Sequence, residues 1–260
     1  MAELVILGSS GWMPQDGMQT TSLALRTADD LVLFDLGSGV ARLRREPLRS
    51  LLPADDREIH VFLSHLHFDH LIGLTFISGL WQNPTVVHVP PAVGEVSGPE
   101  VLDALFGGPF YSHPFSELVP AISRVPVGPG EWPAGRVTVK AWGQDHPGGS
   151  LAYRVGDWFA FMTDTRDTLG AAGFARGVQV LVHEAWSYDE DDPGAARTQA
   201  SGHSSAAQVA RLAVEAGAGE LLLSHLPPNG EDYHQRMLSE ARAIFPRTSL
   251  CYDGLVRRFA

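Results

Sequence analysis

The residues best suited to chemistry lie in the stretch "FLSHLHFDHLIGL", residues 62–74. Four ligand-type side chains fall within six residues there, between two apolar runs: His65, His67, Asp69 and His70. Alternate side chains of an extended turn point the same way, so His65 and His67 can hold one cation as an imidazole pair. Asp69 and His70 offer an oxygen and a nitrogen to a second position. This mixture suits zinc, manganese, iron or nickel better than calcium or magnesium. The pattern therefore predicts a transition-metal site rather than a histidine-rich turn without metal.

Several apolar runs with the pattern of β-strands end in a side chain of this type. His65 follows "VFLS", Asp164 follows "FAFMT", Glu184 follows "VLVH" and His225 follows "LLLS". The runs "LVLF" and "LLL" lack polar alternation, which is typical of strands covered on both faces. Loops at strand ends gather functional groups from distant parts of a chain. The pattern predicts mixed sheets with helices outside them and a site at the strand ends.

Helical periodicity is clearest over residues 71–81, 204–216 and 234–245. Ser204 or Ser205 can cap the second of these helices, and Gly217 can end it. Residues 83–133 are rich in proline and glycine, which indicates irregular structure lying over a site. No low-complexity linker interrupts the chain, so we expect one domain over residues 1–260.

Composition restricts the classes of function. The formal net charge of −11 disfavours extended nucleic-acid binding, whereas a small anionic substrate stays compatible because bound cations reverse the local field. Cys251 is the single cysteine, which excludes an internal disulfide and a cysteine-based zinc site. No apolar run reaches the ~18–20 residues of a membrane span, and no signal peptide is recognisable at the start. We therefore expect a cytoplasmic protein without a membrane partner.

The H-x-H-x-D-H motif after a strand resembles the hallmark of the metallo-β-lactamase superfamily, and the resemblance covers essentially the whole chain. It implies an α/β (α+β) fold, a four-layer αβ/βα sandwich of two mixed β-sheets with the site at one edge. It also implies three further ligands at strand ends. His146 in "GQDHPGG", Asp164 and His225 match these in order and context.

The resemblance implies two divalent metal ions, with zinc favoured and manganese or iron as alternatives. The first metal would be held by His65, His67 and His146, the second by Asp69, His70 and His225, and Asp164 would bridge them. A carboxylate between two cations offsets their repulsion, and water between them becomes hydroxide near neutral pH. Asp69 would orient that nucleophile.

A second motif points to the reaction. In "SGHSSAAQVARLA", His203 and the two serines that follow resemble the H-S-T-like motif of the tRNase Z-like and cyclic-phosphodiesterase branch. In that branch the histidine pairs with an acidic residue at a strand end, which here matches Glu184. Cleavage of a phosphodiester must protonate an alkoxide, and an imidazolium held by a carboxylate is a suitable general acid. The plainer alternative is that His203 only precedes a helix and Glu184 is a surface acid.

The departures from this branch limit the substrate. The tRNA-gripping arm of tRNase Z enzymes lies between the lone histidine and the bridging aspartate, but only 18 residues separate His146 from Asp164. The leading hypothesis is therefore a dinuclear phosphodiesterase acting on a small or cyclic phosphodiester. The alternatives are a lactonase- or thioesterase-type acyl hydrolase, a tRNase Z-like nuclease without the arm, and a non-catalytic binding member. A homodimer is an open alternative to a monomer, because relatives are often dimers.

Other residues carry weaker signals. Gly8, Gly11 and the run Gly37–Gly39 are expected at tight strand ends under the site. Five histidines match no motif: His60, His88, His113, His183 and His234. Four aromatic residues are candidates for lining the cleft, although core packing is the plainer interpretation: Trp81, Phe110, Tyr111 and Trp186.

Overall fold

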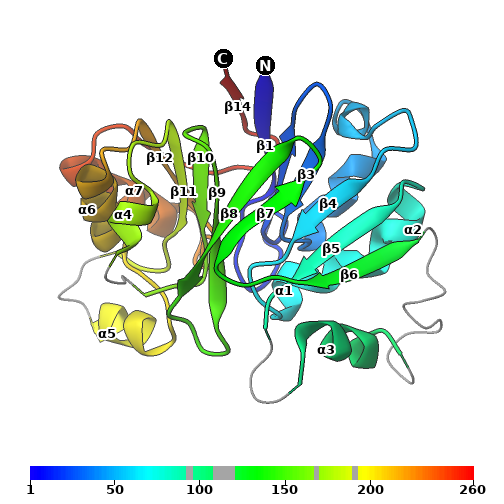
Figure 1. Ribbon diagram of the computed structural model, residues 1–260. Helices are drawn as coiled ribbons and strands as arrows, with labels where there is room; N and C mark the ends of the chain where they lie inside the picture. Colours follow the sequence, from blue (N-terminus) through cyan, green and yellow to red (C-terminus); the bar gives the residue numbers. More distant parts are fainter. Residues whose placement is uncertain (92–95, 108–120, 167–169, 189–192) are drawn as a thin grey trace.

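The computed structural model describes residues 1–91, 96–107, 121–166, 170–188 and 193–260. Two seven-stranded sheets pack face to face, with helices on the outer face of each (Figure 1). This is the four-layer αβ/βα sandwich that the sequence predicted. The chain termini lie together at one edge, where β1 (Ala2–Gly8) pairs with β14 (Val256–Phe259), and α1 (Phe68–Leu71) lies at the opposite edge (Figure 1).

Both sheets are mixed. The first has the order β14-β1-β2-β3-β4-β5-β6, with β2 (Ser22–Arg26), β3 (Leu31–Phe34), β4 (Ile59–Phe62), β5 (Thr85–Val89) and β6 (Ile122–Pro126). The second has the order β13-β12-β11-β10-β9-β8-β7, with β7 (Gly130–Ala134), β8 (Val137–Gln144), β9 (Ser150–Val155), β10 (Phe159–Met162), β11 (Val180–Glu184), β12 (Glu220–Ser224) and β13 (Thr248–Leu250). Strands β3 to β6 are parallel to one another, as are β10 to β13, which brings their carboxyl ends to one edge of each sheet.

Three apolar clusters hold these layers together, one between the sheets and one on the outer face of each. Strand β3 shows why its sequence lacks polar residues: Val32 and Phe34 enter the inner cluster, while Leu31 and Leu33 enter the outer one. Side chains alternate between faces along a strand, so a strand covered on both sides must be apolar throughout. Strand β12 is likewise covered on both faces, although it lies next to the edge of its sheet.

The predicted helices have mixed outcomes. Helix α6 (Ala206–Ala216) begins at the N-cap Ser205 and ends at Gly217, which has a left-handed conformation, and α7 spans Glu231–Ile244. The single helix expected over 71–81 is wrong. The segment is divided into α1, the 3-10 helix η3 (Ile72–Phe76) and α2 (Ile77–Leu80). Gly73 lies in η3, where a Cβ atom would be 2.6 Å from the Leu36 carbonyl oxygen, so this segment follows its neighbour instead of a regular helix.

The expectation of irregular structure over residues 83–133 is also largely wrong. That range contains β5, β6, β7 and helix α3 (Gly98–Leu105), while residues 92–95 and 108–120 lie outside the described part. The remaining short helices are η1 (Ser38–Arg44), η2 (Leu48–Leu51), α4 (Ala171–Phe174) and α5 (Pro193–Ala200). Over the described ranges, no helix has the length and apolarity needed to cross a membrane.

Candidate metal centre

The seven side chains expected as ligands converge at the edge where the parallel strands end. They come from the turn after β4, from α1 and from the segments that follow β8, β10 and β12. One group with mutually close donor atoms contains His65, His67, His146 and Asp164, and a second contains Asp69, His70 and His225. The structure therefore assembles residues up to 160 positions apart (His65 to His225) into the two groups that the resemblance implied.

Asp164 lies between the two groups and turns one carboxylate oxygen to each. Its Oδ1 is 3.8 Å from His65 Nε2 and 3.7 Å from His146 Nε2. Its Oδ2 is 3.1 Å from His70 Nε2 and 3.2 Å from His225 Nε2. This is the arrangement required of a carboxylate that bridges two cations.

Hydrogen bonds behind the histidines leave their other ring nitrogens free to bind a cation. His70 Nδ1 donates to Asp35 Oδ2 at 2.7 Å, and His146 Nδ1 donates to the Gly202 carbonyl oxygen at 3.0 Å. Ser64 Oγ donates to Asp35 at 2.8 Å and lies 2.9 Å from His65 Nδ1. Such contacts fix the tautomer and the orientation of metal-binding histidines. Asp35 was missed in the sequence, although it follows the apolar strand "LVLF" just as Asp164 follows "FAFMT".

The donor set fits divalent cations electrostatically. His65 Nε2 is buried without a hydrogen-bond partner in the described structure, although it points at Asp164. Burial lowers the pKa of His65, His67 and His146, which keeps them in the neutral form that binds metals. Burial also opposes the charge of His70, but the nearby carboxylates outweigh it and raise its pKa well above the usual value. The carboxylates of Asp35, Asp69 and Asp164 surround His70 with negative charge. A cation bound in the site would offset this charge.

His203 and Glu184 form a pair beside this cluster. His203 Nδ1 is 3.1 Å from each carboxylate oxygen of Glu184 and 3.9 Å from Asp164 Oδ1. Glu184 is fully buried and also accepts the Thr165 backbone N–H at 2.8 Å. Burial disfavours the imidazolium, yet the Glu184 carboxylate prevails and raises the pKa of His203 to about 9. Trp186 stacks on the ring of His203, with 4.6 Å between ring centroids and an interplanar angle of 15°.

The backbone around the centre is unusual. Within the described residues, the non-glycine residues with a positive φ are Trp12, Asp35, Asp164 and His225. Each lies at the site or directly behind it, where sparsely populated conformations are found when surrounding structure enforces them. Gly11 meets the expectation of close approach, because a Cβ atom there would be 2.6 Å from the His225 ring.

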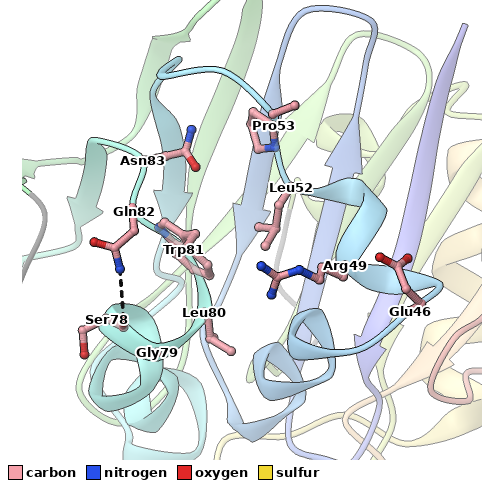
Figure 2. A pocket seen from close by; sticks show the side chains of 11 residues that line it. Glu46, Arg49, Leu52, Pro53, Ser78, Gly79, Leu80, Trp81, Gln82 and Asn83 are labelled. Carbon is pink, nitrogen blue, oxygen red and sulfur yellow. Dashed lines mark hydrogen bonds between the residues drawn. The ribbon is translucent and has the colours of Figure 1, made fainter.

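A pocket of about 180 Å³ opens onto both groups, lined among others by Trp12, His67, Trp186 and His203. Trp186 thus lines the site, as the sequence suggested. Trp81 does not: it is buried, and it borders a separate hollow of about 500 Å³ between η2 and α2 (Figure 2). The expected lining residues Phe110 and Tyr111, and His113, lie outside the described residues. His60, His88, His183 and His234 do not line the pocket.

Comparison with known proteins decides the family. Residues 31–226, more than half of the chain, match the family described as "Beta-lactamase superfamily domain". The chain belongs to the metallo-β-lactamase superfamily. As a member of that superfamily it is a hydrolase that is expected to bind divalent metal ions, for which the two groups of His and Asp side chains supply donors.

Relatives within the superfamily span the whole chain. Ribonuclease BN of Salmonella typhi is 30% identical, with 96% of this chain and 98% of that protein covered. Two solved structures have the same fold. The metallo-β-lactamase fold protein YhfI from Bacillus subtilis has a TM-score of 0.76 at 21% identity, covering 99% of this chain and all of that one. A diphosphatase from the PhnP family has a TM-score of 0.73 at 18% identity, covering 100% of this chain and 98% of that one.

The ribonuclease alignment also shows a difference within the superfamily. It runs over 305 positions, whereas 96% of 260 residues is about 250. About 55 positions of that alignment therefore have no counterpart in this chain.

Proposed function

We propose that the chain is a metal-dependent phosphodiesterase that cleaves a small or cyclic phosphodiester. The observation that carries this proposal is the buried Glu184–His203 pair next to the ligand cluster. A thioester expels a thiolate, which leaves without a proton, whereas the alkoxide that leaves a phosphodiester must be protonated. A histidine held by a buried carboxylate at the wall of the pocket is suited to that task.

In this proposal His65, His67 and His146 would hold one divalent ion and Asp69, His70 and His225 would hold the other, with Asp164 available to both. Zinc is favoured, with manganese or iron as alternatives, because imidazole and carboxylate donors accept all three. When bound, the ions would lower the pKa of attacking water and stabilise the charge on the phosphate.

The remaining steps belong to side chains of the chain itself. Asp69 lines the pocket and its Oδ2 accepts the Trp12 backbone N–H at 2.8 Å, so its carboxylate is held in place to orient the attacking water. Glu184 accepts the hydrogen bond of His203 Nδ1. This leaves Nε2 as the nitrogen that delivers a proton to the leaving oxygen. Glu184 also stabilises the imidazolium, so the acid is charged before the bond breaks.

The proposed substrate is small and anionic. The pocket of about 180 Å³ is smaller than the ~300–1,000 Å³ typical of sites for drug-sized ligands. A phosphodiester group fits such a space. The net charge of −11 does not favour a long nucleic acid, whose binding needs an extended basic surface.

A ribonuclease is the second candidate, favoured by the 30% identity to ribonuclease BN over nearly the full chain. The same His203 chemistry would serve it. Against it stand the acidic charge and the short segment between His146 and Asp164, which has no room for a tRNA-binding arm. Turnover of a precursor tRNA faster than of cyclic nucleotides would make this candidate the better one.

The test compares leaving groups in wild-type protein and the variant His203→Ala, after the metal content of both has been measured. We expect about 10²- to 10⁴-fold slower kcat for a cyclic nucleotide, whose alkoxide needs an acid. The loss should be smaller for bis(p-nitrophenyl) phosphate, whose phenolate leaves unaided. Equal rates of variant and wild type on the cyclic nucleotide at equal metal content would refute the acid role. Wild-type protein that prefers lactones or thioesters would instead support the acyl hydrolase alternative.

A further inference from the structure

Trp12 presents an open aromatic face at the rim of the site. It lies in the loop between β1 and β2, its side chain lines the pocket that holds Asp69, His146 and His203, and the residue is 69% exposed. No stacking contact of its ring occurs among the described residues. A single exposed aromatic residue needs no explanation by itself, but one at the rim of a pocket is available to contact a bound molecule.

The backbone that carries this ring is held firmly. The Trp12 backbone N–H donates to Asp69 Oδ2 at 2.8 Å, and the Gly11 N–H donates to the Leu226 carbonyl oxygen at 3.0 Å. The Leu226 N–H in turn donates to the carbonyl oxygen of Ser9 at 3.0 Å. Trp12 has a φ of 61°, a conformation that a tryptophan adopts only where its surroundings impose it. The loop is therefore pinned to the segments of both Asp69 and His225, while the indole ring stays free.

The size of the pocket indicates what this ring is for. About 180 Å³ accommodates the reacting phosphodiester but not a larger substituent attached to it. The rest of the substrate must then extend over the rim, where Trp12 lies. A second hollow of about 260 Å³ adjoins His67, but Leu66, Pro91 and Val101 make it largely aliphatic, and its described lining contains no tryptophan, tyrosine or phenylalanine.

We propose that Trp12 is a stacking platform for a planar aromatic ring of the substrate, and that this ring is a nucleobase. The inference rests on the proposed phosphodiesterase function and specifies its substrate class as small nucleotides with a diester or cyclic phosphate. Bases stack on tryptophan without strict sequence preference, because every base has a π-face. A ring fixed in advance by its backbone binds at little cost in conformational entropy.

The experiment uses a matched pair of substrates, 2′,3′-cyclic AMP and ribose 2,3-cyclic phosphate, which lacks the base. Trp12→Asn removes the ring while asparagine tolerates the positive φ. We expect it to raise the KM for 2′,3′-cyclic AMP by about 5- to 150-fold, the range that loss of one stacked base produces. The KM for the ribose cyclic phosphate should stay within about twofold of wild type on the same grounds. Trp12→Phe should restore most of the affinity for the nucleotide.

Met13→Ala is the control, because Met13 is 46% exposed in the same loop but does not line the pocket. It should match wild type on both substrates. An equal rise in KM for both substrates in Trp12→Asn would overturn the stacking role and point to displacement of Asp69 instead. Unchanged KM values for both would overturn it as well, while wild-type diester turnover would leave the phosphodiesterase proposal intact. Wild-type protein inactive on every diester would overturn both proposals.

Discussion

Two fully buried carboxylates support the site from opposite sheets, and their surroundings are closely matched. Asp35 follows β3 and Glu184 ends β11. Asp35 accepts the Ser64 backbone N–H at 2.6 Å and Glu184 accepts that of Thr165 at 2.8 Å. Each also receives Nδ1 of one histidine, at 2.7 Å from His70 for Asp35 and at 3.1 Å from His203 for Glu184.

The two pairs differ in what the far nitrogen of the histidine faces. His70 Nε2 points into the ligand cluster, 3.1 Å from Asp164 Oδ2 and 3.2 Å from His225 Nε2. His203 forms part of the pocket wall, where its ring stacks on that of His225 and its Nδ1 lies 3.9 Å from Asp164 Oδ1. The same carboxylate–imidazole unit is thus suited to hold a metal ligand in one half and a mobile proton in the other.

The largest expected effect is that of removing Asp35. Asp35→Ala leaves the Ser64 N–H and the His70 Nδ1–H buried without an acceptor, and should lower the free energy of unfolding by about 3–5 kcal/mol. Urea denaturation measures this loss. Asp35→Asn keeps the shape of the side chain but removes its charge. It should weaken metal affinity about 10- to 100-fold, as judged by metal titration. Wild-type metal affinity in Asp35→Asn would show that His70 needs no support.

Glu184→Gln should distinguish the role of Glu184 from that of Asp35. We expect bound metal to stay at the wild-type level, while kcat for a cyclic diester falls about 10- to 100-fold. Without the carboxylate the pKa of His203 drops from about 9, so activity that needs the imidazolium should disappear at a lower pH than in wild type. A pH–rate profile together with metal analysis tests this. Loss of metal equal to that of Asp35→Asn would mean that both carboxylates serve the metal centre.

The smallest effect concerns His88, a buried histidine of the first sheet with no carboxylate partner among the described residues. It stacks on Phe62 at 3.9 Å, and its Nε2 is 3.3 Å from His60 Nδ1. Burial lowers its pKa from 6.5 to about 4. The unfolded chain binds the proton more readily, so stability should be complete above about pH 6.5 and fall by at most ~3 kcal/mol towards pH 4. His88→Phe should reduce this acid sensitivity in denaturation curves measured between pH 4 and pH 7, and identical curves would exclude the effect.

What the sequence could predict depended on how local each signal was. The motif from His65 to His70 lies within one turn, so its chemistry was recognisable without any structure. His146, Asp164 and His225 could be added only through the resemblance to the superfamily, whose ligands they match in order and context. Asp35 had the same strand-end position, but no local pattern links it to Ser64 and His70, which lie 29 and 35 residues away.

The predictions for residues 71–81 and 83–133 were wrong for the same physical reason: contacts with distant parts of the chain decide the structure there. Strands β5 and β6 pair in parallel with partners more than 25 residues away, and parallel pairing leaves little local signature beside the many prolines and glycines of this region. The helix expected over 71–81 is interrupted around Gly73, whose close packing against Leu36 decides the path of the segment. Trp12 belongs to no motif in the sequence, and its positive φ cannot be foreseen from composition.

The strained backbone at Trp12, Asp35, Asp164 and His225 has a consequence for the heat tolerance of the whole protein. Conformations of this kind cost on the order of 1–3 kcal/mol each. Four of them together approach the roughly 5–15 kcal/mol of net stability that a folded domain has. A cation that binds only the folded chain adds stability that rises with the logarithm of its concentration once this exceeds its Kd. The temperature at which this chain unfolds should therefore follow the supply of metal in its surroundings, so that starvation for metal would deplete the folded protein as well as its activity.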